Sequence, residues 1–160
     1  MSLEDRITRV EAELAIRNVI ARYGMAADCG DIESALACHA EDAVYVVSNP
    51  NAGRGGATGD IELKGHKAIS DMLSSEMHQS LLPDCAHTVG PLLVEVDGHS
   101  ASVLGYSRVY HDQKLMRLAI NHWTLREDGS WKIARRESRV MGETAAQDLL
   151  KKGLQRGHQG

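Results

Sequence analysis

The chain has 160 residues, a length that fits a single domain with a core large enough to need no disulfides. Its formal net charge is -4 at pH 7 and no basic stripe runs along it, which argues against a nucleic-acid partner. The three cysteines, Cys29, Cys38 and Cys85, are an odd number without Cys-x-x-Cys spacing, and we interpret them as free thiols. No signal-like segment opens the sequence, and no apolar run approaches the ~18 residues of a membrane span, so we expect a cytoplasmic protein without membrane contact.

Hydrophobic spacing predicts helices in the first part of the chain. Apolar residues recur every three or four positions from Leu3 to Ala27, which is typical of one long amphipathic helix, and Gly30 is a suitable stop. Asp31 can cap a second, short helix that extends to about His39.

A glycine-rich loop separates two short predicted strands. The strands are expected over residues 43–47 and 61–63, and a helix over 65–79 follows them. The loop over 49–60 lacks the Gly-Lys-Ser/Thr ending of a phosphate loop, and Thr58 occupies the third-glycine position of the dinucleotide fingerprint. We therefore interpret this segment as a loop that could serve as a lid, and not as a nucleotide site.

The second half of the chain predicts an antiparallel meander. Four strand-like segments are separated by turns that include the hairpin pairs Asp97-Gly98 and Asp128-Gly129, and the segments cover residues 86–96, 100–111, 115–125 and 131–140. A short helix over 143–152 follows. Helices first and a meander second indicate an α+β domain over residues 1–152, in which the helices pack on a curved antiparallel or mixed sheet and enclose a pocket. Residues 153–160 are expected to form a flexible tail.

Two polar residues lie where packing residues are expected. Asp28 falls at the inner end of the long helix, and His87 interrupts an apolar strand. Each has an ordinary structural interpretation, since aspartates near helix ends often bind local backbone and histidines can be satisfied core residues. If both point into one cavity, the carboxylate can orient the imidazole and the imidazole can move a proton. Cys85 precedes His87 by two positions, but no third ligand converges in the sequence, so we expect no metal and no cofactor.

Several stretches, spanning residues 5–141, carry a resemblance to a known family. They are Tyr23-x-x-x-x-Asp28-x-Gly30-Asp31 with Ala35-Leu36, then Glu41-Asp42-Ala43-Val44-Tyr45, Gly65-His66-Lys67-Ala68-Ile69, Ala86-His87-Thr88-Val89, Val94-Glu95-Val96-Asp97-Gly98, and the run from His122 to Arg136. In these stretches the chain resembles the SnoaL-like branch of the nuclear transport factor 2-like superfamily. That group contains scytalone dehydratase, bile acid dehydratases, a lindane dehydrochlorinase and steroid Δ-isomerases.

The resemblance implies a cone-shaped α+β barrel with a deep apolar pocket. In dehydratases of this family, an aspartate from the first long helix orients a histidine from the first meander strand, and that histidine is the general base. Asp28 and His87 match these positions, and Tyr23 matches a pocket tyrosine of the bile acid dehydratases. Scytalone dehydratase has a tyrosine directly before the aspartate and a second histidine on the next strand, where this chain has Ala27 and Ser107. The set of catalytic residues found in scytalone dehydratase is therefore incomplete in this chain.

Further residues are candidates for substrate contact. Tyr45 and Ser107 are two of them. On the third meander strand, alternation lets only one of Asn121 and His122 face the pocket, and we expect His122. Arg136 is expected on a solvated or subunit-facing surface of the last strand.

The outer face of the predicted sheet indicates whether the protein associates with further copies of itself. We expect this face to carry residues such as Trp123 and Leu125 or their neighbours. An exposed apolar sheet face tends to be covered, and relatives pair their sheets, so the sequence predicts a homodimer or a higher homo-oligomer.

The leading hypothesis is a cofactor-independent lyase. It would eliminate water, or another leaving group, from a small cyclic hydrophobic ketone, with His87 as the base, Asp28 orienting it and Tyr23 polarising the carbonyl. An isomerase or cyclase using the same pair is an alternative. So are a non-catalytic protein that binds small hydrophobic molecules and an accessory subunit of the kind found in ring-hydroxylating dioxygenases, because the fold hosts all of these.

Overall fold

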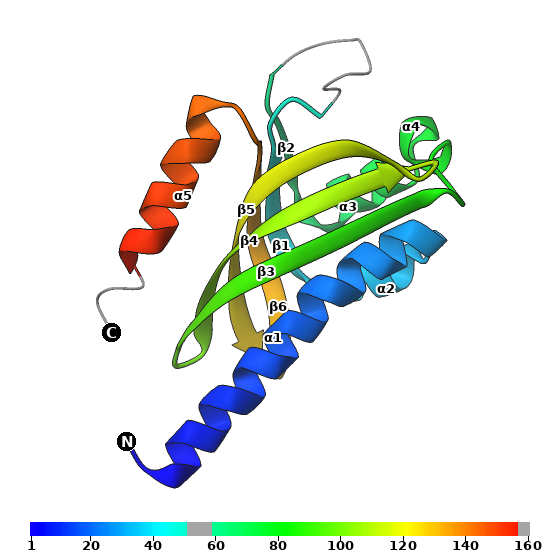
Figure 1. Cartoon of the computed structure of the whole chain (residues 1–160). Helices are drawn as coiled ribbons and strands as arrows, with labels where there is room; N and C mark the ends of the chain where they lie inside the picture. Colours follow the sequence, from blue (N-terminus) through cyan, green and yellow to red (C-terminus); the bar gives the residue numbers. More distant parts are fainter. Residues whose placement is uncertain (51–58, 157–160) are drawn as a thin grey trace.

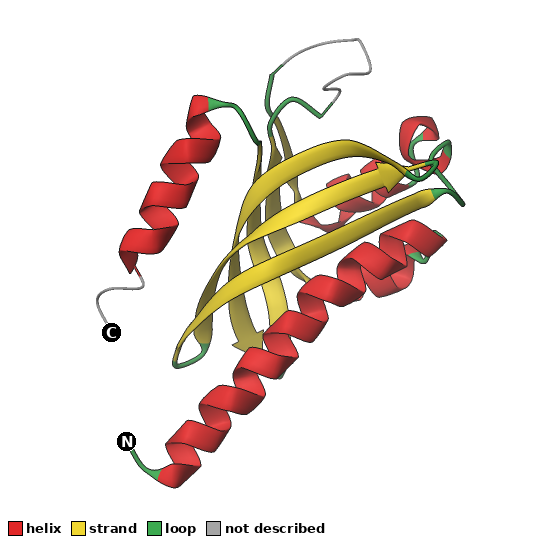
Figure 2. Cartoon of the chain, in the orientation of Figure 1, coloured by secondary structure: helices red, strands yellow, loops and turns green. Residues whose placement is uncertain are grey.

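The computed structural model describes residues 1–50 and 59–156. It consists of a single sheet with helices packed around it (Figures 1 and 2). In chain order they are α1 (Leu3–Cys29), α2 (Ile32–Ala37), β1 (His39–Val47), β2 (Ile61–Lys64), α3 (Gly65–Leu73), α4 (Glu76–Gln79), β3 (Cys85–Asp97), β4 (Ser100–His111), β5 (Lys114–Asp128), β6 (Ser130–Val140) and α5 (Thr144–Arg156). Within the described residues, no helix has the length and apolar character that a bilayer span requires.

The six strands form one mixed sheet in the order β2-β1-β6-β5-β4-β3. β1 runs parallel to β6, and every other neighbouring pair is antiparallel. The long strands curve, α1 lies along the sheet at β3, and α5 lies on the opposite side (Figure 1). The α+β class predicted from the sequence is confirmed, but β2 and β3 remain edges, so the sheet does not close into a barrel.

The long first helix is fixed at both ends by its sequence. Ser2 and Asp5 form a reciprocal capping box, in which the Ser2 hydroxyl accepts from the Asp5 N–H and the Asp5 carboxylate accepts from the Ser2 N–H. Gly30 ends the helix in the left-handed conformation, with φ of 73°, which a glycine adopts without steric cost. Only the second half of the helix is buried, and an apolar stripe on the first half is exposed, made of Leu3, Ile7, Val10 and Leu14.

Gly24 sets the distance between α1 and β3. A Cβ atom at this position would lie 3.1 Å from the His87 carbonyl oxygen and 3.2 Å from the His87 Cβ. The absence of a side chain therefore lets the helix approach the strand closely, one turn before Asp28.

The core lies between α1 and the concave face of the sheet. Ile16 and Ile20 of α1 are in one buried cluster with Trp123 and Leu125 of β5 and Ile133 of β6. The expectation that Trp123 and Leu125 lie on the outer face is therefore wrong. Trp123 is 1% exposed, because the helix covers the face from which it projects.

Several predicted boundaries differ from the structure. The helix expected over 65–79 is divided into α3 and α4, because the Ser75 hydroxyl caps a new helix by accepting from the His78 N–H. His39 begins β1 and is not in α2. The helix expected to end at residue 152 continues to Arg156, so the tail does not begin at 153. Residues 51–58 of the predicted loop lie outside the described residues.

The junction of α2 and β1 contains a buried, uncharged imidazole. The Nδ1 of His39 lies 2.8 Å from the Ala35 carbonyl oxygen and must donate to it, since a carbonyl only accepts. Burial is the main cause that lowers the pKa of His39 to about 4. In the unfolded chain this group titrates near its ordinary value of 6.5. Between these two pH values the unfolded state binds more protons, so protonation of this residue lowers stability as the pH falls.

We predict that His39→Asn flattens the acid side of the stability curve. The shorter amide can still donate to the Ala35 carbonyl, but it does not titrate. The free energy of unfolding of the wild type should fall by about 3 kcal/mol more than that of the variant between pH 6.5 and 4. Urea denaturation at a series of pH values measures this difference. His99→Asn, at an exposed histidine, is the matched control for the loss of an imidazole as such. Equal slopes in wild type and His39→Asn would contradict the prediction.

Candidate active site

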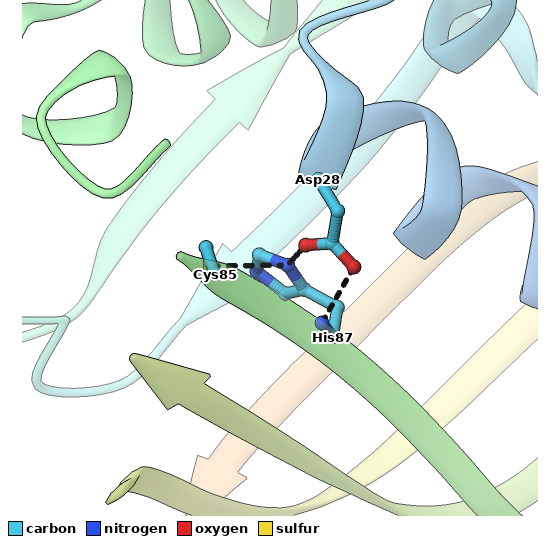
Figure 3. A group of neighbouring side chains, drawn as sticks. All are labelled: Asp28, Cys85 and His87. Atoms are coloured by element: carbon cyan, nitrogen blue, oxygen red, sulfur yellow. Dashed lines mark hydrogen bonds and ion pairs between the residues drawn. The ribbon is translucent and has the colours of Figure 1, made fainter. Parts of the chain in front are cut away.

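A single carboxylate joins α1 to β3. Asp28 lies in the last turn of α1, and its Oδ1 is 2.5 Å from His87 Nδ1, while its Oδ2 accepts from the His87 backbone N–H at 2.8 Å (Figure 3). Because a carboxylate only accepts, Nδ1 carries the proton of the neutral ring, and Nε2 keeps its lone pair. The structure thus brings together the two residues singled out from the sequence, in the arrangement of an oriented base.

Cys85 completes a group of three potential metal ligands. A carboxylate oxygen of Asp28, Cys85 Sγ and a ring nitrogen of His87 all lie within 4.8 Å of one another (Figure 3). The spacing of Cys85 and His87 offered two of these ligands in the sequence, and the fold brings Asp28 to them as the third. Two ligands of one zinc ion lie more than ~3 Å apart, given bonds of ~2.0–2.2 Å at tetrahedral angles. The 2.5 Å between Asp28 and His87 is a direct hydrogen bond, so the geometry fits proton transfer better than coordination.

The pair adjoins a cavity of about 170 Å³ between the sheet, α1 and the α3–α4 segment. Four of the predicted site residues line it: Tyr23, Tyr45, His87 and Ser107. Asp28 stands behind His87. The other lining residues are mostly apolar, and they are Ala27, Val47, Pro50, Ile61, Leu63, Met72, Leu73, Ser75, Met77, His78, Leu81, Val109, Met116, Arg117 and Arg136.

Tyr23 is the buried phenol of this cavity. Burial is the main cause that raises its pKa far above the ordinary value, so the hydroxyl stays protonated and can donate. Among the described residues its hydroxyl has no hydrogen-bond partner. The His39 ring stands edge-on to it, with centroids 4.7 Å apart, and fixes the plane of the phenol.

The expectation that His122 faces the pocket is wrong. Its side chain lies on the outer face of β5, where Nε2 is 2.7 Å from the Ser102 hydroxyl, and it lines a separate hollow under α5. Asn121 is the residue that faces inward. It is fully buried, donates to the Ser107 hydroxyl at 2.7 Å and accepts from Arg136 Nε at 3.0 Å.

His78 is a further histidine at the cavity that the sequence analysis missed. It comes from α4, and both of its ring nitrogens are buried without a hydrogen-bond partner among the described residues. Its ring stacks near that of His87, with centroids 6.3 Å apart and planes at 23°. Burial, and then the proximity of His87, lower its pKa and favour the neutral form. No motif marked this residue, because its direction depends on the helix break at Ser75.

The comparisons with known proteins agree with this architecture. The model of the SnoaL-like domain matches residues 8–137. The chain belongs to the SnoaL-like family. No curated protein matches the sequence.

Solved structures share the fold of this SnoaL-like chain. An NTF2-like protein with a cystatin-like fold from Novosphingobium aromaticivorans is 34% identical, with a TM-score of 0.79 over 92% of this chain and 94% of that one. A candidate scytalone dehydratase from the same organism is 20% identical, with a TM-score of 0.68 over 85% and 88% of the two chains. An NTF2-like protein of unknown function from Pseudomonas putida is 19% identical, with a TM-score of 0.66 over 84% and 90%. The last two show likeness of fold alone.

We predict that Asp28→Asn reverses the tautomer of His87. The asparagine amide can donate to Nδ1, so the ring proton would move to Nε2. Long-range ¹H–¹⁵N spectra of the histidine rings, recorded well above the titration range, distinguish the two tautomers. Glu127→Gln removes the carboxylate of the exposed His99–Glu127 pair and is the control that should leave the His87 signals unchanged. A wild-type His87 protonated on Nε2 would contradict this assignment.

Proposed function

We propose that this SnoaL-like protein is a cofactor-independent lyase that eliminates water from a small cyclic hydrophobic ketone carrying a β-hydroxyl group. The main support is the 2.5 Å hydrogen bond between Asp28 and His87 Nδ1, which leaves Nε2 as the basic nitrogen of a residue that lines the cavity. General base assistance of this kind contributes ~10²–10⁴-fold to a rate.

The proposed reaction begins with proton removal. Nε2 of His87 takes the proton from the carbon next to the carbonyl, and the C–H electron pair moves into an enolate. Asp28 stabilises the imidazolium that forms, because the carboxylate already accepts from Nδ1. The enolate then reforms the carbonyl and expels the β-hydroxyl group, which takes the proton from the imidazolium and leaves as water. The products are an enone and the enzyme in its starting state.

The enolate oxygen needs a hydrogen-bond donor in this scheme, and we assign that role to Tyr23. Its hydroxyl is protonated because burial raises its pKa, and it has no other partner among the described residues. A donor that is already in place and shielded from water stabilises developing charge without reorganisation. Tyr45 is the second candidate for the same role, since it lines the same cavity.

The lining indicates the size and character of the substrate. The cavity of about 170 Å³ is walled mainly by aliphatic and thioether side chains, which favours one apolar ring. An accessory subunit would have no need of an aspartate and a histidine at such a cavity. A binding protein could use them only as contacts, so the decisive property is turnover.

The proposal is tested with a panel of cyclic β-hydroxy ketones. Enone formation is followed by ultraviolet absorption, and mass spectrometry distinguishes loss of water from isomerisation. His87→Gln should lower kcat/KM by ~10²–10⁴-fold for any substrate found. Asp28→Asn should also lower it, since the ring would present a protonated Nε2.

His99→Gln is the matched control and should have wild-type activity, because this exposed histidine also pairs with a carboxylate but lies away from the cavity. Turnover by His87→Gln within a few-fold of wild type would show that His87 is not the base. Ligand binding without turnover in the wild type would favour the binding protein.

A further inference from the structure

Two arginines project into the cavity of the Asp28–His87 pair. Arg136 of β6 is 7% exposed, and Arg117 of β5 is half-buried. Both side chains line the cavity. The expectation that Arg136 lies on a solvated or subunit-facing surface is wrong, because this residue shares the inner face of the sheet with Asn121 and Trp123.

Neither arginine has a carboxylate partner among the described residues. The Arg136 guanidinium lies over the rings of Tyr23, Tyr45 and Trp123, at 5.7, 4.7 and 5.4 Å from their centroids, and it donates through Nε to Asn121. Its Nη atoms make no hydrogen bond with the described residues. This arrangement holds the cation in place, and no described residue accepts a hydrogen bond from its Nη N–H groups.

Arg117 is held by neutral acceptors. Its Nη1 donates to the Ser48 carbonyl at 2.9 Å and its Nη2 to the Ser138 hydroxyl at 3.2 Å. Burial is the first cause that lowers its pKa, and Arg136 lowers it further, whereas Tyr45 and Glu143 raise it. The two guanidiniums therefore repel each other across a shared apolar space, which disfavours the empty cavity and favours an anion between them.

Two arginines on the outer face, in contrast, form ion pairs with carboxylates. Arg139 of β6 pairs with Asp60 and Glu137, and Arg126 of β5 pairs with Asp42. The lining of the cavity includes no aspartate or glutamate. The eight residues 51–58, outside the described part of the chain, also include none in their sequence, so they offer no side-chain carboxylate to the two inner arginines.

We propose that the cavity binds a ligand with an apolar ring and one carboxylate, and that Arg136 and Arg117 bind the carboxylate. The proposed ligand is also the substrate class of the proposed lyase. The reaction rests on the proposed function, whereas binding of the carboxylate by the two arginines does not. In the sheet order, β6 and β5 are central and β3 is an edge, with β4 between β5 and β3. A ring held by its carboxylate at β5 and β6 would extend past Ser107 and Val109 of β4 toward His87 of β3.

The test compares two probes that differ in charge and not in shape. Benzoate and benzamide are titrated into the full chain by isothermal calorimetry. Hydrogen bonds to buried charged groups predict that the wild type prefers benzoate by about tenfold or more. Arg117→Gln and Arg136→Gln should each remove most of this preference. Arg139→Gln is the matched control, an arginine of the same strand as Arg136 with carboxylate partners on the outer face, and it should keep the preference.

Each outcome decides for or against the proposal. Equal binding of the two probes by the wild type overturns it, as does a preference that survives in both Arg117→Gln and Arg136→Gln. Circular dichroism checks folding, and Arg117→Gln decides alone if the buried Arg136→Gln does not fold. A preference lost in His87→Gln but kept in the arginine variants would place the anion at the Asp28–His87 pair and also overturn the proposal. Benzoate has no leaving group, so failure of the lyase assay leaves this result unaffected.

Discussion

The site depends on one carboxylate that accepts from two groups of the same residue. Asp28 binds the backbone N–H of His87 and its ring Nδ1, and so fixes both the strand and the imidazole relative to α1. β3 is an edge strand, so this N–H faces the helix and would lack a sheet partner. The close approach permitted by Gly24 brings the helix within reach. The same contact therefore gives Asp28 both its structural role and the chemical role that we propose for it, so a substitution of Asp28 affects both.

The inner face of the sheet combines an apolar core with a short chain of polar side chains. Arg136 donates to Asn121, and Asn121 donates to Ser107, so three neighbouring strands are linked by hydrogen bonds between buried groups. Buried polar groups are tolerated only when they are paired, and this chain satisfies most of them. Among the described residues, both buried ring nitrogens of His78 lack a partner, and neither the Tyr23 hydroxyl nor the Arg136 Nη atoms bind a described residue; all three residues line the cavity. These polar groups therefore lie where a ligand can satisfy them.

Local patterns predicted most elements, and family resemblance predicted the Asp28–His87 pairing. The main error concerned the phase of β5. Alternation places Asn121, Trp123 and Leu125 on one face and His122 on the other, but it does not say which face is inside. The tryptophan and leucine could have decided this, since large apolar side chains favour the core, and Asn121 would then have been assigned to the interior with them. The positions of His78 and Arg117 depend on a helix break and on long-range packing, which no local pattern contains.

The two walls of the cavity differ in charge. Cationic groups lie on the central strands β5 and β6, and the His87 imidazole lies on the edge strand β3. An aspartate and a histidine alone would orient a proton transfer without orienting a substrate. For the ligand that we propose, a charged contact at the opposite wall would fix which carbon faces Nε2, and such positioning contributes to rate in its own right. Tyr23 lies near the cationic wall, with Arg136 over its ring, so charge that develops at its hydroxyl meets a nearby positive group. The phenol nevertheless remains protonated, because burial outweighs Arg136 in setting its pKa, and it can therefore act as a donor and not as a second base.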